Sequence, residues 1–206
     1  MFDCDEKTGL AEFCRSFALE AEVRSALVID IRGNAGGHVS GLVLARLMQR
    51  PLAHDVPRHG APTKWPAGAA PPGRAVLLID EHTSSDGDML AWAFRRLQLG
   101  KIVGRQTWGG VDGISQTHTL VDGSVVAQAS ERLQPLPARA GEEPAVLENH
   151  GVQPDIEMPF APHAFGQDAD PQLSCALQHA LQQLAEDKDS GLLAPEAFLH
   201  IDDRYR

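Results

Sequence analysis

Two adjacent serines, Ser84 and Ser85, stand in a polar turn between an apolar run and a segment with helical character. The first N–H groups of a helix have no intrahelical partner, and together with the helix dipole they favour an anion beside such a hydroxyl. A nucleophile next to preorganised donors is what acyl transfer through a tetrahedral oxyanion requires. The alternative is that one of the serines only caps the helix.

A second turn of similar type follows another apolar run and reads DIRGNAGG over residues 30–37. If the two preceding strands are neighbours, amides from both turns can converge on one point, because Gly33, Gly36 and Gly37 allow close backbone approach. Phosphate binding is the weaker interpretation, since neither the dinucleotide fingerprint nor the P-loop pattern is present. Tight turns shaped by glycine, without any site, stay open as an alternative.

Alternating apolar runs and amphipathic segments must position these turns, and they predict a mixed α/β domain. Residues 51–74 hold much of the Pro and Gly and are expected to form a surface excursion. Residues 131–147 are expected to be irregular, and Gly100 is the expected C-terminal cap of the third helix. We expect helices over residues 9–20, 39–49, 88–97 and 171–186, buried strands over 26–31 and 75–80, a third strand over 101–104, and a hairpin over 115–129 around Asp122-Gly123.

The composition excludes several classes of function. The chain has 206 residues, of which 43% are hydrophobic, and a formal net charge of −10, which argues against nucleic-acid binding. No apolar run is long enough for a membrane span. Cys4, Cys14 and Cys175 lack metal-ligand spacing and are odd in number, which favours ordinary thiols in a reducing, cytoplasmic setting. We expect no metal and no cofactor.

Four ordered segments between residues 26 and 158 resemble the S41 serine peptidases, and the match is best to the C-terminal catalytic domain of tricorn core proteases. Residues 30–37 resemble the D-x-R-x-N-x-G-G segment of this family, and residues 81–87 its nucleophile turn. Residues 99–110 resemble the segment that follows, and residues 148–157 the closing E-N-x-G-V-x-P-D motif. The four motifs together are far more specific than any one of them.

This resemblance implies a crotonase-like ββα fold, with the S41 catalytic core in residues 1–160 and a helical tail in 161–206 that packs on it. The implied activity is that of a serine endopeptidase or oligopeptidase acting on peptides without a metal or cofactor. The implied assembly is a homo-oligomer. Since tricorn proteases carry further modules ahead of this domain, we expect the chain to be the N-terminally truncated, C-terminal part of such a protease.

The resemblance also assigns roles to individual residues. Ser85 is implied as the nucleophile, and the amide of Asp86 as one donor of the oxyanion hole. The second donor is implied to come from the glycine turn (residues 33–37), where Gly37 is favoured over Gly36. Glu148 is implied in the charge system that orients the general base. Loss of one oxyanion-hole donor typically costs about 3 kcal/mol of transition-state stabilisation.

The general base is the point of departure from the family pattern. The carboxy-terminal processing peptidases have a lysine after T-x-G, where this chain has Gly110, and Lys101 is interpreted as a surface residue. A histidine base of the tricorn type is therefore favoured, but it lies ahead of all four motifs, and none of the nine histidines here holds that position. His82 and His38 are the candidate substitutes, and His150 is given no role.

Two other functions stay open. The missing histidine favours a catalytically inactive domain that binds peptides or mediates oligomerisation. A crotonase-like acyl-CoA enzyme shares the fold and the two-turn oxyanion hole, but it explains neither the Ser85 turn nor the Glu148 motif. In tricorn proteases an acidic residue between the first turn and the nucleophile sets a preference for basic residues. Asp55 lies in that interval and is the candidate substrate-binding residue.

Overall fold

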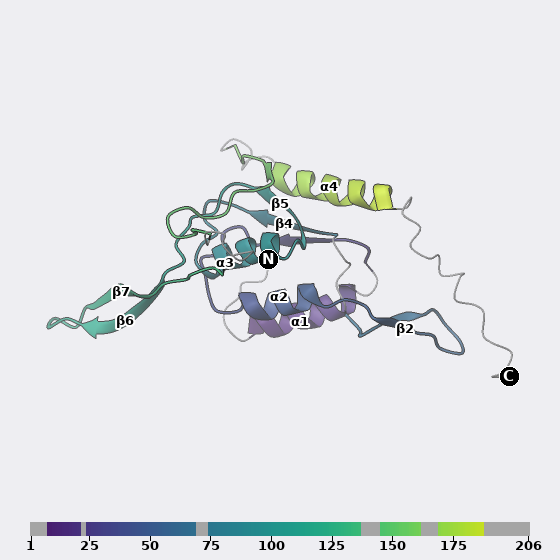
Figure 1. Ribbon diagram of the computed structural model, residues 1–206, viewed down its shortest axis with the longest axis horizontal. Helices are drawn as coiled ribbons and strands as arrows, with labels where there is room; N and C mark the ends of the chain where they lie inside the picture. The colour runs from purple at the N-terminus through teal and green to yellow at the C-terminus, as the bar shows by residue number, and fades with distance from the viewer. Residues whose placement is uncertain (1–7, 22–23, 69–73, 137–144, 162–168, 188–206) are drawn as a thin grey trace.

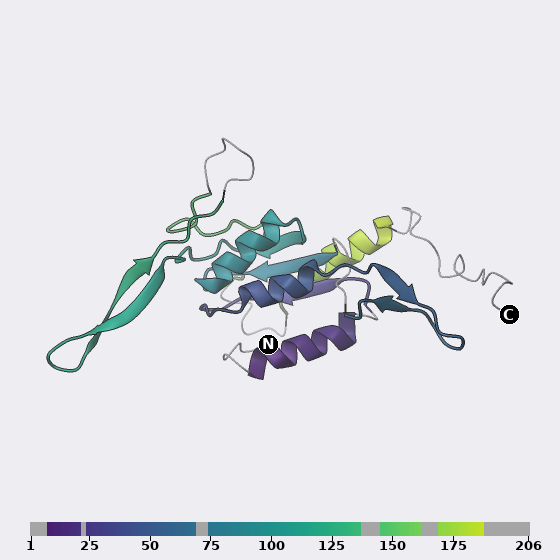
Figure 2. The ribbon, with the colours of Figure 1, turned by 60° about the horizontal axis from the view of Figure 1, so that its bottom comes forward.

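The computed structural model describes residues 8–21, 24–68, 74–136, 145–161 and 169–187. Its centre is a parallel four-stranded sheet in the order β1-β4-β5-β8, with helices on both faces (Figure 1). Two separate antiparallel hairpins extend from opposite ends of the body (Figure 2). The elements are α1 (Thr8–Ala21), β1 (Leu27–Asp30), α2 (Ser40–Met48), β2 (Ala53–Asp55), β3 (Thr63–Trp65), β4 (Ala75–Ile79), α3 (Asp86–Arg96), β5 (Gly100–Gly104), β6 (Gly113–Thr119), β7 (Val125–Glu131), β8 (Ile156–Glu157) and α4 (Pro171–Asp187).

The buried strand β4 divides the core into two layers. Its side chains alternate between faces, as they do in any strand, and all five residues are buried. Leu77 and Ile79 face the layer formed by α1, α2 and α3, in which Phe94 is fully buried. Val76 and Leu78 face α4 on the other side. The strand–helix alternation predicted a mixed α/β domain, and the structure shows one with helices on both faces of a parallel sheet.

Helix α3 ends at Arg96, one residue earlier than the sequence indicates, and the cap predicted at Gly100 is wrong. The left-handed residue is Gln98, with φ of 53°. The Gln98 N–H donates to the carbonyl of Arg95 at 2.9 Å, and the Leu99 N–H to that of Phe94 at 3.1 Å, which is the Schellman pattern. Gly100 instead begins β5, where a Cβ would lie 1.7 Å from the carbonyl oxygen of Ala75. That glycine is needed for strand contact, not for helix termination.

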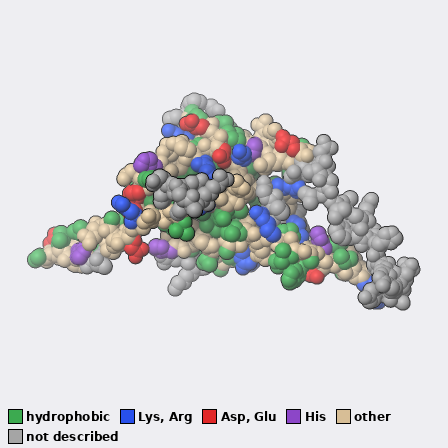
Figure 3. All heavy atoms as spheres, in the orientation of Figure 1, with side chains coloured by type: hydrophobic (Ala, Val, Ile, Leu, Met, Phe, Trp, Pro, Cys, Tyr) green, Lys and Arg blue, Asp and Glu red, His purple; other side chains and the backbone are tan. Residues whose placement is uncertain are grey.

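Both hairpins lie outside the sheet. The hairpin predicted over residues 115–129 is present as β6 and β7, the arm that extends to the left in Figure 3, and all of β7 is exposed. The excursion predicted over 51–74 contains a second, short hairpin, in which His54 pairs with Lys64. Strand β8 was not predicted either, because two residues are too few to show a period. Within the described residues, no helix is long and apolar enough to cross a membrane.

Helix α4 follows the region of the four motifs and docks on the sheet. Ala176 is fully buried and Ala180 nearly so, both against Val76, Leu78 and Val103. Helix α4 thus covers the face of the sheet opposite to α2 and α3. The rest of the predicted tail, at 162–168 and 188–206, and Cys4 lie outside the described residues. The division into residues 1–160 and 161–206 stays a prediction.

Candidate active site

Ser85 occupies a strained backbone conformation directly between β4 and α3. Its φ of 54° and ψ of −116° lie in a region that residues with a side chain rarely adopt. A serine on such a sharp strand-to-helix turn presents its hydroxyl at the top of the sheet, as nucleophile elbows do. Ser85 is the N-cap residue of α3, but its side chain makes no capping hydrogen bond. The conformation thus holds the hydroxyl without giving it a structural task in the helix.

The glycine turn contacts Ser85 closely. Gly36 has φ of 125°, and a Cβ on it would lie 2.9 Å from Cβ and 3.2 Å from Oγ of Ser85. Its N–H already donates to Oδ1 of Asn34 at 2.9 Å. The N–H groups of Gly37 and Asp86 have no hydrogen-bond partner within the part of the chain that the structure describes. Of the two glycines, Gly37 therefore has the amide that is free to bind an oxyanion.

The carboxylate of Asp86 joins the nucleophile turn to helix α2. Its Oδ2 accepts the N–H groups of Val39 at 2.8 Å and Ser40 at 2.9 Å, and its Oδ1 accepts the hydroxyl of Ser40 at 2.5 Å. Asp86 is 8% exposed, so these contacts are shielded from water. They satisfy donors at the start of α2 that the helix itself cannot satisfy. The side chain of Asp86 is thus occupied, while its backbone N–H stays free.

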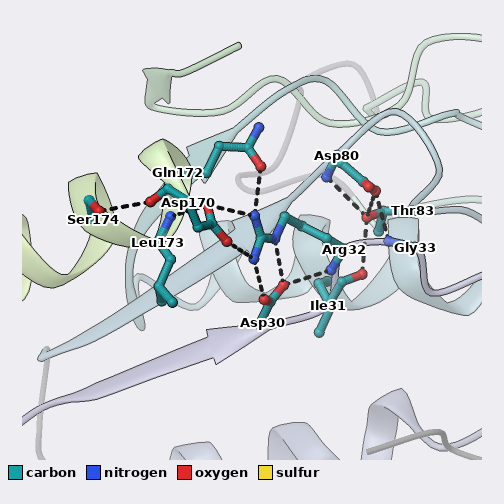
Figure 4. Close-up of polar contacts among 10 residues, drawn as sticks. All are labelled: Asp30, Ile31, Arg32, Gly33, Asp80, Thr83, Asp170, Gln172, Leu173 and Ser174. Atoms are coloured by element: carbon teal, nitrogen blue, oxygen red, sulfur yellow. Dashed lines mark hydrogen bonds and ion pairs between the residues drawn. The ribbon is translucent and has the colours of Figure 1, made fainter. Parts of the chain in front are cut away.

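Asn34 and Asp80 provide further connections between the two turns. The carbonyl of Asn34 accepts the N–H of Ser84 at 2.8 Å. The Oδ1 of Asp80 accepts the N–H of Gly33 and the hydroxyl of Thr83, each at 2.9 Å (Figure 4). Sequence analysis assigned no role to Asn34, Asp80 or Thr83. Their polar side chains inside the two turn motifs could have indicated such a role, since buried polar groups need hydrogen-bond partners.

A third loop, after β5, is fixed to the first turn of α3 by Asp88. This carboxylate is fully buried and accepts the N–H groups of Gly109 at 3.0 Å and Gly110 at 3.2 Å. The N–H of Trp108 donates to the carbonyl of Thr83 at 2.9 Å. Trp108 itself is exposed. Loops after three neighbouring parallel strands therefore meet at one edge of the sheet, where α/β proteins usually bind ligands.

Glu148 belongs to a fourth loop and contacts the third. Its Oε2 accepts the N–H groups of Val111 at 2.7 Å and Asp112 at 2.9 Å. The N–H of Asn149 donates to the carbonyl of Gly109 at 2.7 Å, which adds a backbone connection between the same loops. Glu148 thus lies in the assembly of loops around Ser85. Its role in orienting a general base stays a prediction.

The candidate bases and Asp55 are not brought to Ser85 by any described contact. His82 and His38 are exposed, and among the described histidines no ring is hydrogen-bonded to Ser85. The ring of His150 instead contacts the carbonyl of Glu148 at 2.8 Å. Asp55 is exposed on the β2–β3 hairpin, at the far end of α2 from the glycine turn (Figure 2). Its role in substrate binding stays a prediction.

Comparison with known proteins decides the family. The family described as peptidase family S41 matches residues 2–158. The chain belongs to peptidase family S41. This S41 chain is 36% identical over 176 residues to the tricorn protease of Thermoplasma acidophilum, an alignment that covers 85% of the chain. It is 39% identical over 176 residues to a tricorn protease homolog of Saccharolobus solfataricus, again over 85% of the chain.

Solved structures agree with the α/β fold and its parallel sheet. The crystal structure of the tricorn protease matches 86% of the S41 chain with a TM-score of 0.76 and 36% identity, over 17% of that protein. The photosystem II D1 C-terminal processing protease matches 83% of the chain with a TM-score of 0.50 and 25% identity, over 43% of that protein. The mixed α/β fold of the S41 type predicted from the sequence is confirmed.

The S41 chain is much shorter than these relatives. The alignments cover 16% of the length of both tricorn relatives. A protein of Sulfurisphaera tokodaii, 37% identical over 178 residues, has a name that describes it as a tricorn-like protease C-terminal subunit. All these names are those of proteases, so the comparisons give no support to the alternative of a catalytically inactive domain.

Proposed function

We propose that this chain is the catalytic C-terminal part of a tricorn-like serine peptidase that cleaves peptides through an acyl-enzyme at Ser85. The observation that carries the proposal is the strained Ser85 with two unpartnered amides beside it, those of Gly37 and Asp86. A structural serine gains nothing from such strain, whereas a nucleophile does. The family membership and the tricorn relatives support the same activity.

In the proposed reaction, Oγ of Ser85 attacks the carbonyl carbon of a peptide bond and loses its proton to a base. The oxyanion of the tetrahedral intermediate accepts hydrogen bonds from Gly37 and Asp86, which are held in place before substrate arrives. Collapse of the intermediate expels the amine, which takes the proton from the base. Water then hydrolyses the ester on Ser85 by the same steps in reverse order.

The proton acceptor has to come from outside the described contacts of Ser85. A histidine is the group that the family resemblance implies, and Glu148 is proposed to orient it. The ordinary pKa of a histidine side chain lies near neutrality, which suits proton transfer in both directions. Assembly into a homo-oligomer and a cytoplasmic location stay predictions.

Covalent labelling tests the proposal. The purified chain is treated with a fluorophosphonate probe, with and without added imidazole as an external base, and the adduct is located by peptide mass spectrometry. We expect the adduct on Ser85, and stronger labelling with imidazole. Ser84→Ala is the matched control and is expected to label like the unmodified chain, because Ser84 precedes the N-cap position.

Either of two results would contradict this proposal. An adduct on Ser84 that is lost in Ser84→Ala would place the nucleophile at the wrong residue. Folded protein that fails to label in both conditions would show that the hydroxyl and the two amides do not form a reactive site. Labelling only with imidazole supports the proposal, with the base supplied from another segment.

Gly36→Ala is expected to lower peptide hydrolysis about 100-fold, because a displacement of about 1 Å at the reacting group has an effect of that size. The new methyl would lie 2.9 Å from Cβ of Ser85, so one of the two turns must shift. Gly41→Ala is the matched control, since nothing lies within 4 Å of its added methyl and it stands inside α2. That control should keep its activity and gain about 1 kcal/mol of stability. Equal activities of the two variants would refute the close contact.

A further inference from the structure

Arg32 lies between β1 and the glycine turn, with its side chain only 16% exposed. Its guanidinium meets two carboxylates and one amide oxygen (Figure 4). The Nε and Nη2 atoms donate to Asp30 at 2.9 and 2.6 Å. The Nη1 and Nη2 atoms donate to Asp170 at 3.1 and 2.7 Å, and Nη1 also donates to Gln172 at 2.9 Å. Two bidentate pairs of this type fix the plane of a guanidinium as well as its position.

Asp30 transmits that position to the backbone of the turn. The same Oδ1 that accepts Nε of Arg32 also accepts the Arg32 backbone N–H, at 3.1 Å. The next residue, Gly33, is fixed by Asp80 from the other side. The guanidinium, through Asp30, therefore fixes the position of the Arg32 backbone, from which the chain continues to Gly36. Glycine has no side chain of its own to define such a path.

The remaining two partners of Arg32 belong to the start of α4. Asp170 stands immediately before the helix and accepts the N–H of Leu173 at 2.9 Å, the contact typical of an N-cap residue. Gln172 is 2% exposed and its Nε2 donates to the carbonyl of Met158 at 2.7 Å. Both acceptors are thus held rigidly by the helix. They reach Arg32 from the opposite face of the sheet to α2 and α3.

The polar cluster is not needed to dock α4, because Ala176 and Ala180 already pack on the sheet. Partly buried ion pairs add little net stability, since desolvation opposes the attraction between the charges. Burial favours the neutral form of Asp170, but the hydrogen bonds from Arg32 and from Leu173 outweigh it and lower its pKa. Asp170 is therefore ionised at neutral pH. What the cluster supplies is a defined geometry.

We propose that Asp170 and Gln172 are positioning residues for the oxyanion-binding turn, and that they act on it through Arg32. This inference rests on the proposed function of that turn. Helix α4 then contributes to the site without touching substrate. Weakening the cluster should loosen the turn and slow the chemical step, while the affinity for substrate changes little.

A double-mutant cycle with Asp170→Asn and Arg32→Gln tests the coupling. Asparagine caps helices as well as aspartate does, so the loss is confined to the ion pair. For a fluorogenic peptide, we expect Asp170→Asn to lower kcat about tenfold and to leave KM within about twofold, the signature of an interaction made in the transition state. In the Arg32→Gln background the same substitution should have no further effect. Independent, additive effects would overturn the proposal.

Amide hydrogen exchange at Gly33 and Gly36 gives a second readout that does not depend on activity. The N–H of Gly33 donates to Asp80, which follows β4, and the N–H of Gly36 donates to Asn34, so their exchange reports local opening of the turn. We expect about tenfold faster exchange in Asp170→Asn and in Arg32→Gln. Ala180→Gly, which weakens α4 elsewhere, should leave the exchange at these two residues unchanged.

The kinetic and exchange measurements distinguish failure of the positioning role from failure of the proposed function. Unchanged exchange at Gly33 and Gly36 in Asp170→Asn would overturn the positioning role, whatever the peptide assay shows. Equally fast exchange in Ala180→Gly would also overturn it, because general weakening of α4 would then be the cause. Faster exchange confined to the cluster variants supports the positioning role. If the unmodified protein showed no peptide hydrolysis that depends on Ser85, the proposed function would fail, and the positioning role would still be tested by the exchange rates.

Discussion

Ser85→Gly is expected to abolish peptide hydrolysis and, at the same time, to stabilise the protein. Removal of a nucleophilic serine lowers kcat by up to about 10⁶-fold in serine peptidases. The backbone of Ser85, at φ 54° and ψ −116°, costs about 1–3 kcal/mol for a residue with a side chain. Glycine relieves that strain and loses about 0.5–1 kcal/mol through its greater freedom in the unfolded chain. A net gain of about 1 kcal/mol remains.

Hydrolysis of a fluorogenic peptide and unfolding in urea measure the two effects. Ser85→Ala is the matched control, because it removes the hydroxyl but keeps the Cβ that causes the strain. It should lose the activity and show no gain in stability. If Ser85→Gly were no more stable than Ser85→Ala, the strain would not be present in solution, and the argument from strain to function would lose its basis.

Gly104→Ala is expected to destabilise the fold by more than about 4 kcal/mol, a loss that few single substitutions cause. Gly104 ends β5 with φ of 131°, and a Cβ would lie 1.9 Å from the carbonyl oxygen of Ile79. That oxygen also accepts the N–H of Arg105 at 3.1 Å, and the contact lies between the two central strands of the sheet, at their carboxyl ends. The two strands would have to separate to make room. Urea unfolding, or loss of folded protein on expression, measures the effect.

Gly123→Ala provides the comparison that isolates the steric part. Gly123 has φ of 83°, and nothing lies within 4 Å of an added Cβ. Its substitution carries only the conformational cost of a left-handed residue, about 1–2 kcal/mol. Similar losses for the two variants would mean that β4 and β5 can separate at little cost. The view that the site stands on rigid strand ends would then be wrong.

The elements of the core could be predicted because their patterns are long or strongly apolar. The strand predicted at 75–80 contains an unbroken apolar run over residues 75–79, and the helix at 171–186 repeats apolar residues on one face. The hairpin around Asp122-Gly123 follows from turn chemistry. The β2–β3 hairpin and β8 escaped because strands of two or three residues leave no measurable period. Gly100 was misassigned because the sequence alone does not distinguish a glycine required by close strand contact from one that caps a helix.

At the site, residue type and motif order pointed to Ser85, Asp86 and the glycine turn. The preference for Gly37 over Gly36 came from the family resemblance, and the structure adds that Asn34 already accepts the N–H of Gly36. The structural tasks of Asp88 and Asp170 could not be predicted. Their partners are backbone N–H groups and an arginine 21 to 138 positions away, and no local pattern encodes such pairs.

The contacts between Arg32 and Asp170 join residues that are 138 positions apart in the chain. Closing a loop of that length is slow compared with forming a helix, and a parallel sheet adds further long-range pairings. A chain emerging from the ribosome therefore carries the nucleophile turn well before α4 exists to complete its support. The support that we propose for the oxyanion-binding turn is then complete only after α4 has been synthesised.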